Sequence, residues 1–231
     1  MRWRLLLAAT ALLPHAAHAE VPQCRLPPQV AAPALPAPDG PRRVLPIAGY
    51  TLALSWSPEY CRTRGRDAGA AFQCGGKLGR FGFILHGLWP EAAPGEWPQW
   101  CPAAPLSAET VRRHLCMTPS PGLLAHEWAK HGACMASTPE AYFTSGASLL
   151  AAIRFPDMMR LSRRPGLTAG QLRDAFRSAT PALPAAAIRV KANARGWLEE
   201  VHICYGKDLR PAACAERAAE DSAPLKIWRG R

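Results

Sequence analysis

Residues 83–90 read Phe-Ile-Leu-His-Gly-Leu-Trp-Pro. The aromatic and branched residues at the start of this stretch are typical of a β-strand, and we expect the strand to cover residues 81–86. His86 would then close the strand and meet a turn at Gly87, which places an imidazole at a sheet edge. A single histidine in such a place is more often a structural hydrogen-bond donor than a catalytic group. The stretch therefore predicts a strand, and a catalytic site only if other reactive residues accompany it.

Further strands are expected at both ends of the chain, with helices between them. Residues 50–56 read as the first strand, and strand character returns at 187–191 and 197–204. A glycine-rich loop through Cys61 and Cys74 is expected to follow the first strand. This order predicts an α+β fold, in which a single domain has a mainly antiparallel central sheet flanked by helices.

Four helices are predicted, three of them from their capping residues. Ser107, Thr138 and Thr168 are residue types that cap helix N-termini, and Pro139 follows Thr138 in the first turn, where proline is favoured. The predicted helices cover residues 107–115, 123–131, 138 onward and 168–178.

The first 19 residues read as a signal peptide. Arg2 and Arg4 precede an apolar run at residues 5–13, and Ala-His-Ala at 17–19 is a small-x-small cleavage site, so we expect cleavage before Glu20. The alternative of a membrane anchor is disfavoured, because the apolar run is shorter than the roughly 18 residues that a membrane span needs. We therefore expect an exported chain with no membrane span.

The mature chain is expected to consist of a proline-rich N-terminal segment at residues 20–47 and one catalytic domain at residues 48–231. The segment has no hydrophobic periodicity and favours extended polyproline II, with Cys24 pinning its start to the body. A chain of 231 residues suits one domain, and 48% hydrophobic with 19% charged residues excludes a wholly disordered chain.

Cysteine content and charge indicate the compartment and the class of partner. Eight cysteines in an exported chain predict four disulfides, because the periplasm and the extracellular space oxidise thiols. No C-x-x-C pair occurs, so the spacing does not suggest zinc. The 28 Lys and Arg exceed the 17 Asp and Glu, which favours a nucleic acid or an anionic surface as partner, unless the arginines only reflect the composition of the coding DNA. We expect a periplasmic or secreted, disulfide-stabilised protein.

The second reactive stretch, residues 126–134, reads His-Glu-Trp-Ala-Lys-His-Gly-Ala-Cys. On a helix His126, Lys130, Glu127 and His131 fall at about 0°, 40°, 100° and 140°, so all four ionisable groups share one face. A solvated polar face is the simpler interpretation, but two histidines beside a charged pair are an uncommon way to build one. The face offers two imidazoles that can exchange protons near neutral pH, a carboxylate, and an ammonium group for an anionic transition state.

A zinc hydrolase is the alternative that this stretch suggests, because it begins His-Glu and ends in His. The H-E-x-x-H site needs histidines four residues apart, whereas His126 and His131 are five apart and diverge by about 140°. Lys130 would also place a cation beside the metal. We therefore expect neither a metal nor another cofactor.

The two stretches together resemble the paired active-site signatures of the ribonuclease T2 family. The similarity includes Leu-Ser-Trp-Ser-Pro-Glu-Tyr-Cys at residues 54–61 and covers roughly residues 48–215. The resemblance implies an endoribonuclease of low base specificity that cuts single-stranded RNA through a 2′,3′-cyclic phosphate without metal. It also implies that DNA is not cleaved, because the attacking group is the 2′-hydroxyl of RNA, and we expect a monomer.

The resemblance also assigns roles to the residues of the two stretches. It implies that His131 is the general base and His86 the general acid. Glu127 and Lys130 would stabilise the phosphorane, and His126 would hold the phosphate.

Base binding is expected to depend on aromatic rings. Stacking is worth about 1–3 kcal/mol per base and tolerates any base. By resemblance, Trp89 is the stacking platform. Trp97 stands where relatives often have Tyr, and Glu91 where some have an Asp that contacts a purine edge, so both depart from the family pattern. Packing within the loop is the alternative for Trp97 and Trp100.

The resemblance implies a disulfide pairing as well. It pairs Cys61 with Cys74, Cys101 with Cys134, and Cys204 with Cys214, which leaves Cys24 with Cys116.

One alternative from another class stays open at this point. The chain could be a secreted, non-catalytic protein that binds RNA or another polyanion on the same scaffold. The presence of His86, Glu127, Lys130 and His131 argues against it.

Overall fold

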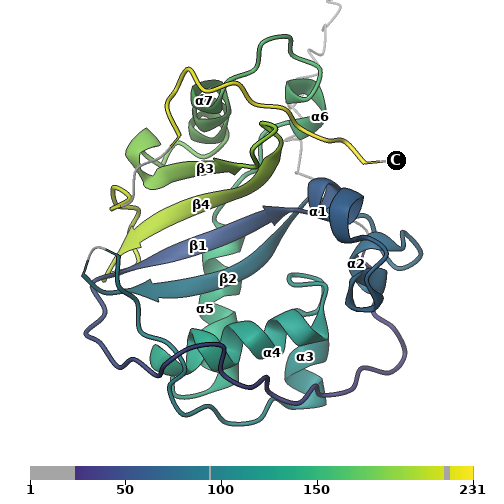
Figure 1. The fold of residues 1–231 in the computed structure, drawn as a ribbon, viewed down its shortest axis with the longest axis vertical. Helices are drawn as coiled ribbons and strands as arrows, with labels where there is room; N and C mark the ends of the chain where they lie inside the picture. The colour runs from purple at the N-terminus through teal and green to yellow at the C-terminus, as the bar shows by residue number, and fades with distance from the viewer. Residues whose placement is uncertain (1–23, 94, 216–218, 231) are drawn as a thin grey trace, which may run out of the picture.

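The computed structural model describes residues 24–93, 95–215 and 219–230 (Figure 1). Within these residues the strands form one antiparallel sheet in the order β2-β1-β4-β3. They are β1 (Gly49–Trp56), β2 (Phe83–Glu91), β3 (Ile188–Ala192) and β4 (Leu198–Gly206). The predicted α+β fold with a mainly antiparallel sheet is confirmed. The predicted signal peptide lies outside the described residues.

The middle strand β1 brings distant parts of the chain together. Leu52 pairs with Leu88 of β2 on one side and with Ile203 of β4 on the other, and all three side chains are buried. Helix α5 (Pro139–Ala151) crosses behind the sheet, and α7 (Ala169–Ala179) lies beside β3 (Figure 1). Among the described residues, no helix lies in front of β1, β2 and β4 in this view (Figure 1).

The prediction that this strand ends at His86 is wrong, because β2 continues past His86. Ala53 pairs with Gly87 and Leu54 with Leu85, so His86 is an extra residue that has no partner on β1. Such a β-bulge bends the strand and re-aims the side chain at that point. The strand then continues to Glu91, and because β2 lies at the edge of the sheet, it tolerates Pro90. Gly87 is therefore part of a bulge and not a turn.

The three helix starts that were predicted from capping residues are confirmed. Ser107, Thr138 and Thr168 each accept a hydrogen bond from the backbone N–H three residues further on. Ser107 caps α3 (Ala108–His114), Thr138 caps α5, and Thr168 caps α7, where Gln171 returns the bond to the Thr168 N–H. These side chains satisfy backbone donors that a helix N-terminus otherwise leaves unpaired.

Helix α4 (Pro121–Lys130) carries most of the second reactive stretch. It begins two residues earlier than predicted, because Ser120 caps it and Pro121 occupies the first turn. It also ends one residue earlier, since His131 is the C-cap residue and Gly132–Cys134 continue as a 3-10 turn. The His131 side chain therefore stands at the end of the helix.

Three short helices were not predicted. α1 (Ser57–Arg64) and α2 (Ala71–Cys74) occupy the expected glycine-rich loop, and α6 (Met158–Leu161) follows α5. Pro58 in the first turn of α1 and the Glu59–Arg62 ion pair stabilise that helix, whereas Gly65 and Gly75 only end α1 and α2. Among the described residues, no helix has the length and apolar character needed to span a membrane.

The proline-rich segment is described from Cys24 onward and forms neither helix nor strand. It runs along the lower edge of the molecule in Figure 1, in front of α3 and α4. The Cys24–Cys116 disulfide holds its start, and Arg43 exchanges backbone hydrogen bonds with Gln99 near its end. The segment is extended, as expected, but it lies against the body over its length and reaches the functional site described below.

Four disulfides stabilise the fold, and they are the same four pairs that the resemblance implies. They join Cys24 to Cys116, Cys61 to Cys74, Cys101 to Cys134, and Cys204 to Cys214. The Cys101–Cys134 disulfide ties the turn after His131 to the loop that carries Trp100. It thereby fixes the C-terminal end of the reactive helix.

Candidate active site

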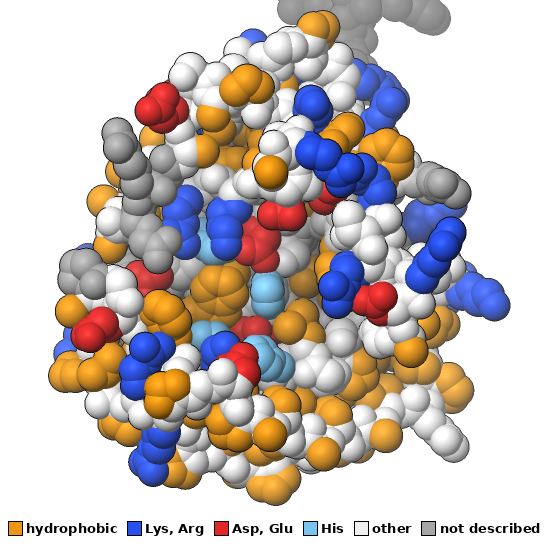
Figure 2. Space-filling view, in the orientation of Figure 1, with side chains coloured by type: hydrophobic (Ala, Val, Ile, Leu, Met, Phe, Trp, Pro, Cys, Tyr) orange, Lys and Arg blue, Asp and Glu red, His pale blue; other side chains and the backbone are white. Residues whose placement is uncertain are grey.

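Histidine side chains gather in a hollow on the open face of the sheet, with acidic and basic side chains around them (Figure 2). The groups come from β2, from the end of α4 and from β4. Strand β2 and α4 approach closely at Gly87, where a Cβ atom would overlap the Glu127 carboxylate and the Trp89 indole. A glycine at this position allows the two reactive stretches to meet.

The bulge on β2 directs the imidazole of His86 between two carboxylates. His86 Nδ1 lies 2.7 Å from Glu200 Oε1, and His86 Nε2 lies 3.4 Å from Glu127 Oε1. Burial lowers the pKa of His86, but the negative charges of Glu127 and Glu200 together outweigh burial, so its pKa stands above the ordinary value. These surroundings therefore favour the protonated form of His86 more than water does.

Glu127 is buried and held by the indole of Trp89. Trp89 Nε1 donates a 2.7 Å hydrogen bond to Glu127 Oε2. Burial raises the pKa of the Glu127 carboxyl, and the neighbouring His86 opposes this change. The Trp89 ring lies 5.3 Å from the ring of His86, 5.6 Å from that of His131 and 5.2 Å from that of His202. Trp89 thus forms the centre of the histidine cluster.

His131 has the opposite electrostatic character to His86. Burial, and next the positive charge of Lys130, lower the pKa of His131 to about 3. The imidazole is therefore neutral at pH 7. Among the described residues, no group forms a hydrogen bond with its buried Nδ1 atom. A neutral imidazole has one basic nitrogen, which can accept a proton from a bound molecule.

Lys130 and His126 form a second group beside the first, around Trp100. Lys130 Nζ donates to both carboxylate oxygens of Asp39, at 2.9 and 3.1 Å, and Trp100 Nε1 donates to Asp39 Oδ1 at 3.1 Å. The Trp100 ring lies 5.7 Å from that of His126. Burial and then Lys130 lower the pKa of His126. His126 and Lys130 thus lie together on one face of the helix. Asp39 of the proline-rich segment forms an ion pair with Lys130.

Trp100 has a structural role in this group, which fits the packing alternative. Its side chain is buried, and its backbone φ of 57° lies in the left-handed region that side chains rarely adopt. The Trp100 N–H donates to the backbone oxygen of Lys130, which attaches this loop to the end of α4.

The two predicted base-contacting residues that depart from the family pattern have other partners in the structure. Thr51 Oγ1 donates a hydrogen bond to Glu91 Oε1, so the Glu91 carboxylate is held against β1. Trp97 is 38% exposed, its ring faces the Arg43 guanidinium at 4.5 Å, and its Nε1 donates to Gln99. Trp97 is the more accessible of the two for a ligand.

Sequence reasoning missed Ser55, Asp39, Glu200 and His202. Glu200 and His202 stand two positions apart on β4, with the buried Val201 between them, and so face the same side of the sheet as the site. Two polar residues that are separated by an apolar residue in a predicted strand are a signal that could have been used. Asp39 has no comparable signal, because it stands alone in a proline-rich segment.

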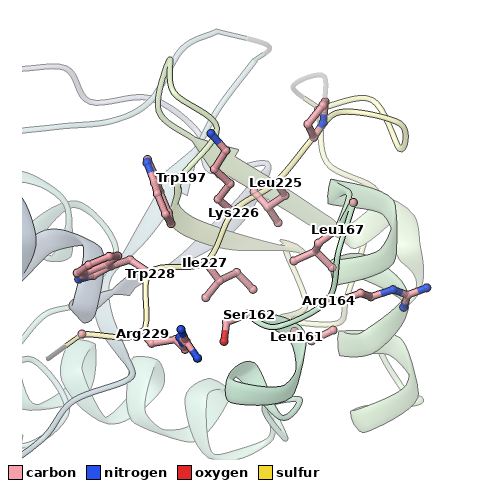
Figure 3. Close-up of a pocket in the computed structure, with 13 residues that line it drawn as sticks. Leu161, Ser162, Arg164, Leu167, Trp197, Leu225, Lys226, Ile227, Trp228 and Arg229 are labelled. Carbon is pink, nitrogen blue, oxygen red and sulfur yellow. The ribbon is translucent and has the colours of Figure 1, made fainter.

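A separate pocket lies away from the histidine cluster and has neither histidine nor carboxylate side chains in its lining. It has a volume of about 440 Å³ and lies between α6 and the C-terminal residues, with Trp197 and Trp228 at one side (Figure 3). Among the described residues, no group of three or more His, Cys, Asp or Glu side chains is arranged to hold a metal ion. The histidine cluster, in contrast, places imidazoles and carboxylates within contact distance, so it can move protons.

Comparison with known sequences places this chain in a family. The sequence profile of the Ribonuclease T2 family matches residues 48–214. A protein of Haemophilus influenzae named "Probable ribonuclease" is 31% identical over 186 residues, which cover 74% of this chain and 62% of that protein. A "Ribonuclease" of Aeromonas hydrophila is 30% identical over 183 residues, which cover 76% of this chain and 80% of that protein. The chain thus spans less than two thirds of the Haemophilus relative.

Solved structures share the fold. An RNase-related protein from Calystegia sepium matches with a TM-score of 0.62 at 22% identity, covering 78% of this chain and 96% of that chain. RNase NT, solved in complex with 5′-AMP, matches with a TM-score of 0.57 at 20% identity, covering 79% and 98%. At these identities the likeness concerns the fold.

Proposed function

Because the chain belongs to the ribonuclease T2 family, we propose that it is an endoribonuclease that cleaves single-stranded RNA by transphosphorylation, without a metal ion or another cofactor. The observation that carries the proposal is the pair of opposite electrostatic environments around His86 and His131. A neutral and a protonated imidazole in one hollow are what a reaction with one general base and one general acid requires.

The proposed reaction begins at the 2′-hydroxyl of the substrate, which is already next to the phosphorus. His131 takes the proton of this hydroxyl, and the oxygen attacks the phosphorus. His86 gives its Nε2 proton to the departing 5′-oxygen, which leaves a 2′,3′-cyclic phosphate. The low pKa of His131 keeps its ring unprotonated, and the raised pKa of His86 favours the form that can donate a proton.

The remaining groups act on the pentacoordinate phosphorane. Lys130 supplies a positive charge, and His126 beside it holds the phosphate. Burial raises the pKa of Glu127, and a carboxyl that takes up a proton more readily can donate a hydrogen bond to an anionic oxygen. Such a hydrogen bond explains how a carboxyl group can lie beside an anionic transition state.

We propose low base specificity for the same site. Trp89 offers part of its ring to a base, and stacking on an aromatic face does not distinguish bases strongly. Glu91, which could read a base edge, is engaged by Thr51, and Trp97 is 38% exposed, so part of its ring is accessible for stacking. The partner is therefore single-stranded RNA of mixed sequence.

The proposal includes export of a monomeric enzyme to the periplasm or the medium. Four disulfides suit an oxidising compartment, and the N-terminal features of residues 1–19 suit a signal peptide. We propose that residues 20–47 form the N-terminal segment and residues 48–231 the catalytic domain.

The direct test is digestion of a mixed-sequence RNA and the matching DNA by the purified mature protein in EDTA. We expect RNA cleavage at the untreated rate, 2′,3′-cyclic phosphate ends after all four bases, and intact DNA, because DNA has no 2′-hydroxyl. Loss of activity in EDTA with recovery on adding zinc would contradict the metal-independent mechanism. Binding of RNA without cleavage would favour the non-catalytic alternative.

The contact between Asp39 and Lys130 leads to a further prediction. A substrate phosphate must displace the Asp39 carboxylate, whose pKa is lowered by its hydrogen bond to Lys130. We expect Asp39→Asn to lower KM about two- to fivefold, the range that removal of an exposed ion pair allows. Asp67→Asn is the matched control, since Asp67 is an exposed aspartate that pairs with Arg64. Slower cleavage by Asp39→Asn alone would mean that Asp39 holds Lys130 in place for catalysis.

A further inference from the structure

Glu200 of β4 contacts three polar side chains in the hollow, namely Ser55, His86 and His202. Its Oε1 atom accepts from Ser55 Oγ at 2.8 Å and lies 2.7 Å from His86 Nδ1. Its Oε2 atom lies 2.8 Å from Nε2 of the fully buried His202. Glu200 stands 114 residues from His86 in the sequence, and the pairing of β1 with both β2 and β4 brings the two together.

The direction of these hydrogen bonds is determined by Arg189. Its Nη2 lies 2.7 Å from His202 Nδ1, and because a guanidinium can only donate, His202 Nδ1 accepts. The proton of a neutral His202 is then on Nε2 and points at Glu200 Oε2. Burial lowers the pKa of His202, which favours this neutral form. The other carboxylate oxygen, Oε1, is therefore available to accept from Ser55 and His86.

This network leaves one arrangement for His86. Its Nδ1 atom carries a proton and donates it to Glu200, so Nε2 is the nitrogen that faces Glu127 and exchanges protons. Burial favours the protonated carboxyl of Glu200, but the hydrogen bonds from His202 and His86 outweigh burial and keep its pKa well below the usual range. A carboxylate that stays charged also stabilises the imidazolium form of His86.

We propose that Glu200, oriented by His202, is the positioning residue of His86: it fixes the Nδ1 proton, directs Nε2 toward the substrate and stabilises the protonated ring. The proposal rests on the proposed function, in which His86 is the general acid. Glu200 itself does not touch the reacting atoms. The same logic applies to a buried carboxylate that holds a catalytic histidine in one tautomer in serine proteases.

Other charged and titratable groups also face His86 and must be separated from Glu200 in a test. They are Glu127 and His126 of α4, His131 after α4, His202 of β4 and Lys191 of β3. Of these, Glu127 is the other carboxylate that raises the pKa of His86. A change confined to Glu200 leaves Glu127 in place.

The experiment compares wild type with Glu200→Gln by NMR titration of the histidine rings and by steady-state kinetics. In the variant we expect the pKa of His86 to fall by about one to three pH units, the effect of losing a nearby opposite charge. We expect kcat to fall about 10–100-fold with little change in KM, the size of effect seen when a carboxylate that orients a metal-binding histidine is removed. The alkaline limb of the pH profile should move to lower pH, because His86 then loses its proton earlier.

Glu199→Gln is the matched control, since Glu199 is the exposed neighbour of Glu200 on the same strand. It should keep the wild-type titration of His86 and the wild-type rate. If Glu200→Gln does not fold, the ¹⁵N shifts of the wild-type rings test the same arrangement. We expect neutral His86 to carry its proton on Nδ1 and His202 to carry its proton on Nε2, and the opposite tautomer of His86 would overturn the proposal.

The NMR readout also separates this proposal from the proposed function. An unchanged pKa of His86 in Glu200→Gln would refute the positioning role even if RNA cleavage were lost. A lowered pKa in a protein whose wild type does not cleave RNA would refute the proposed function and leave the hydrogen-bond arrangement intact.

Discussion

Replacing either His86 or His131 with phenylalanine is expected to lower kcat by about 10²–10⁴-fold, the usual contribution of one general acid or base. Phenylalanine keeps a ring against Trp89, so RNA binding and folding should largely survive. The double variant should be little slower than either single one, because both groups act in the same step. Rates on a dinucleotide and on polymeric RNA, with thermal unfolding of each variant, measure this.

His114→Phe is the matched control for these variants. His114 is a buried histidine that stacks on Phe143 at 5.1 Å and lies outside the cluster. Its replacement should leave kcat unchanged. Near-normal turnover by a His86 or His131 variant would exclude the mechanism that uses both histidines.

The pH dependence of kcat/KM follows from the two pKa values of the free enzyme. The base must be neutral, so the rate should rise with pH through the pKa of His131, which is held at about 3. The acid must be protonated, so the rate should fall as pH rises through the pKa of His86, which is above its ordinary 6.5. The residual rate of His131→Phe should lack the acidic limb, and that of His86→Phe the alkaline limb.

Local signals in the sequence predicted much of this fold. Branched and aromatic residues mark all four strands, and Ser107, Thr138 and Thr168 mark three helix starts because a cap acts within three residues. The same kind of signal misled at α1, where Gly65 suggested a loop although it only ends the helix. The bulge at His86 has no local signal, since it depends on how β2 pairs with β1.

The candidate site was predictable only in part for a related reason. His86, Glu127 and His131 stand in two short stretches whose residue types already indicate proton transfer. Glu200 and Asp39 enter the site through contacts that span 114 and 91 residues of sequence. The pattern of residues within one segment does not predict a contact with a distant segment. The contact between Glu200 and His86 could therefore be identified only from the order of the strands in the sheet.

The close approach of β2 to α4 is the feature that a single methyl group should disrupt. In Gly87→Ala, the new Cβ would overlap the Glu127 carboxylate and the Trp89 indole nitrogen. Either the bulge must open or Glu127 must leave its hydrogen bond with Trp89. We expect kcat/KM to fall about 10²-fold or more, because a displacement of about 1 Å can have that effect, and unfolding free energy to fall by about 1–3 kcal/mol from overpacking.

Two other glycines separate loss of geometry from loss of stability. At Gly69 an added Cβ meets no atom within 4 Å, so Gly69→Ala should change neither rate nor stability. At Gly146 on α5 the Cβ would lie 2.9 Å from Leu85 Cδ2, so Gly146→Ala should lower stability through overpacking in the core, with a much smaller effect on rate. Urea unfolding and kcat/KM of the three variants, measured together, distinguish these cases.

If Gly87→Ala and Gly146→Ala lose rate only in proportion to stability, catalysis does not depend on the contact between Gly87 and Glu127. A rate loss confined to Gly87→Ala would mean that the reaction needs the carboxyl of Glu127 where the bulged strand admits it, within reach of His86.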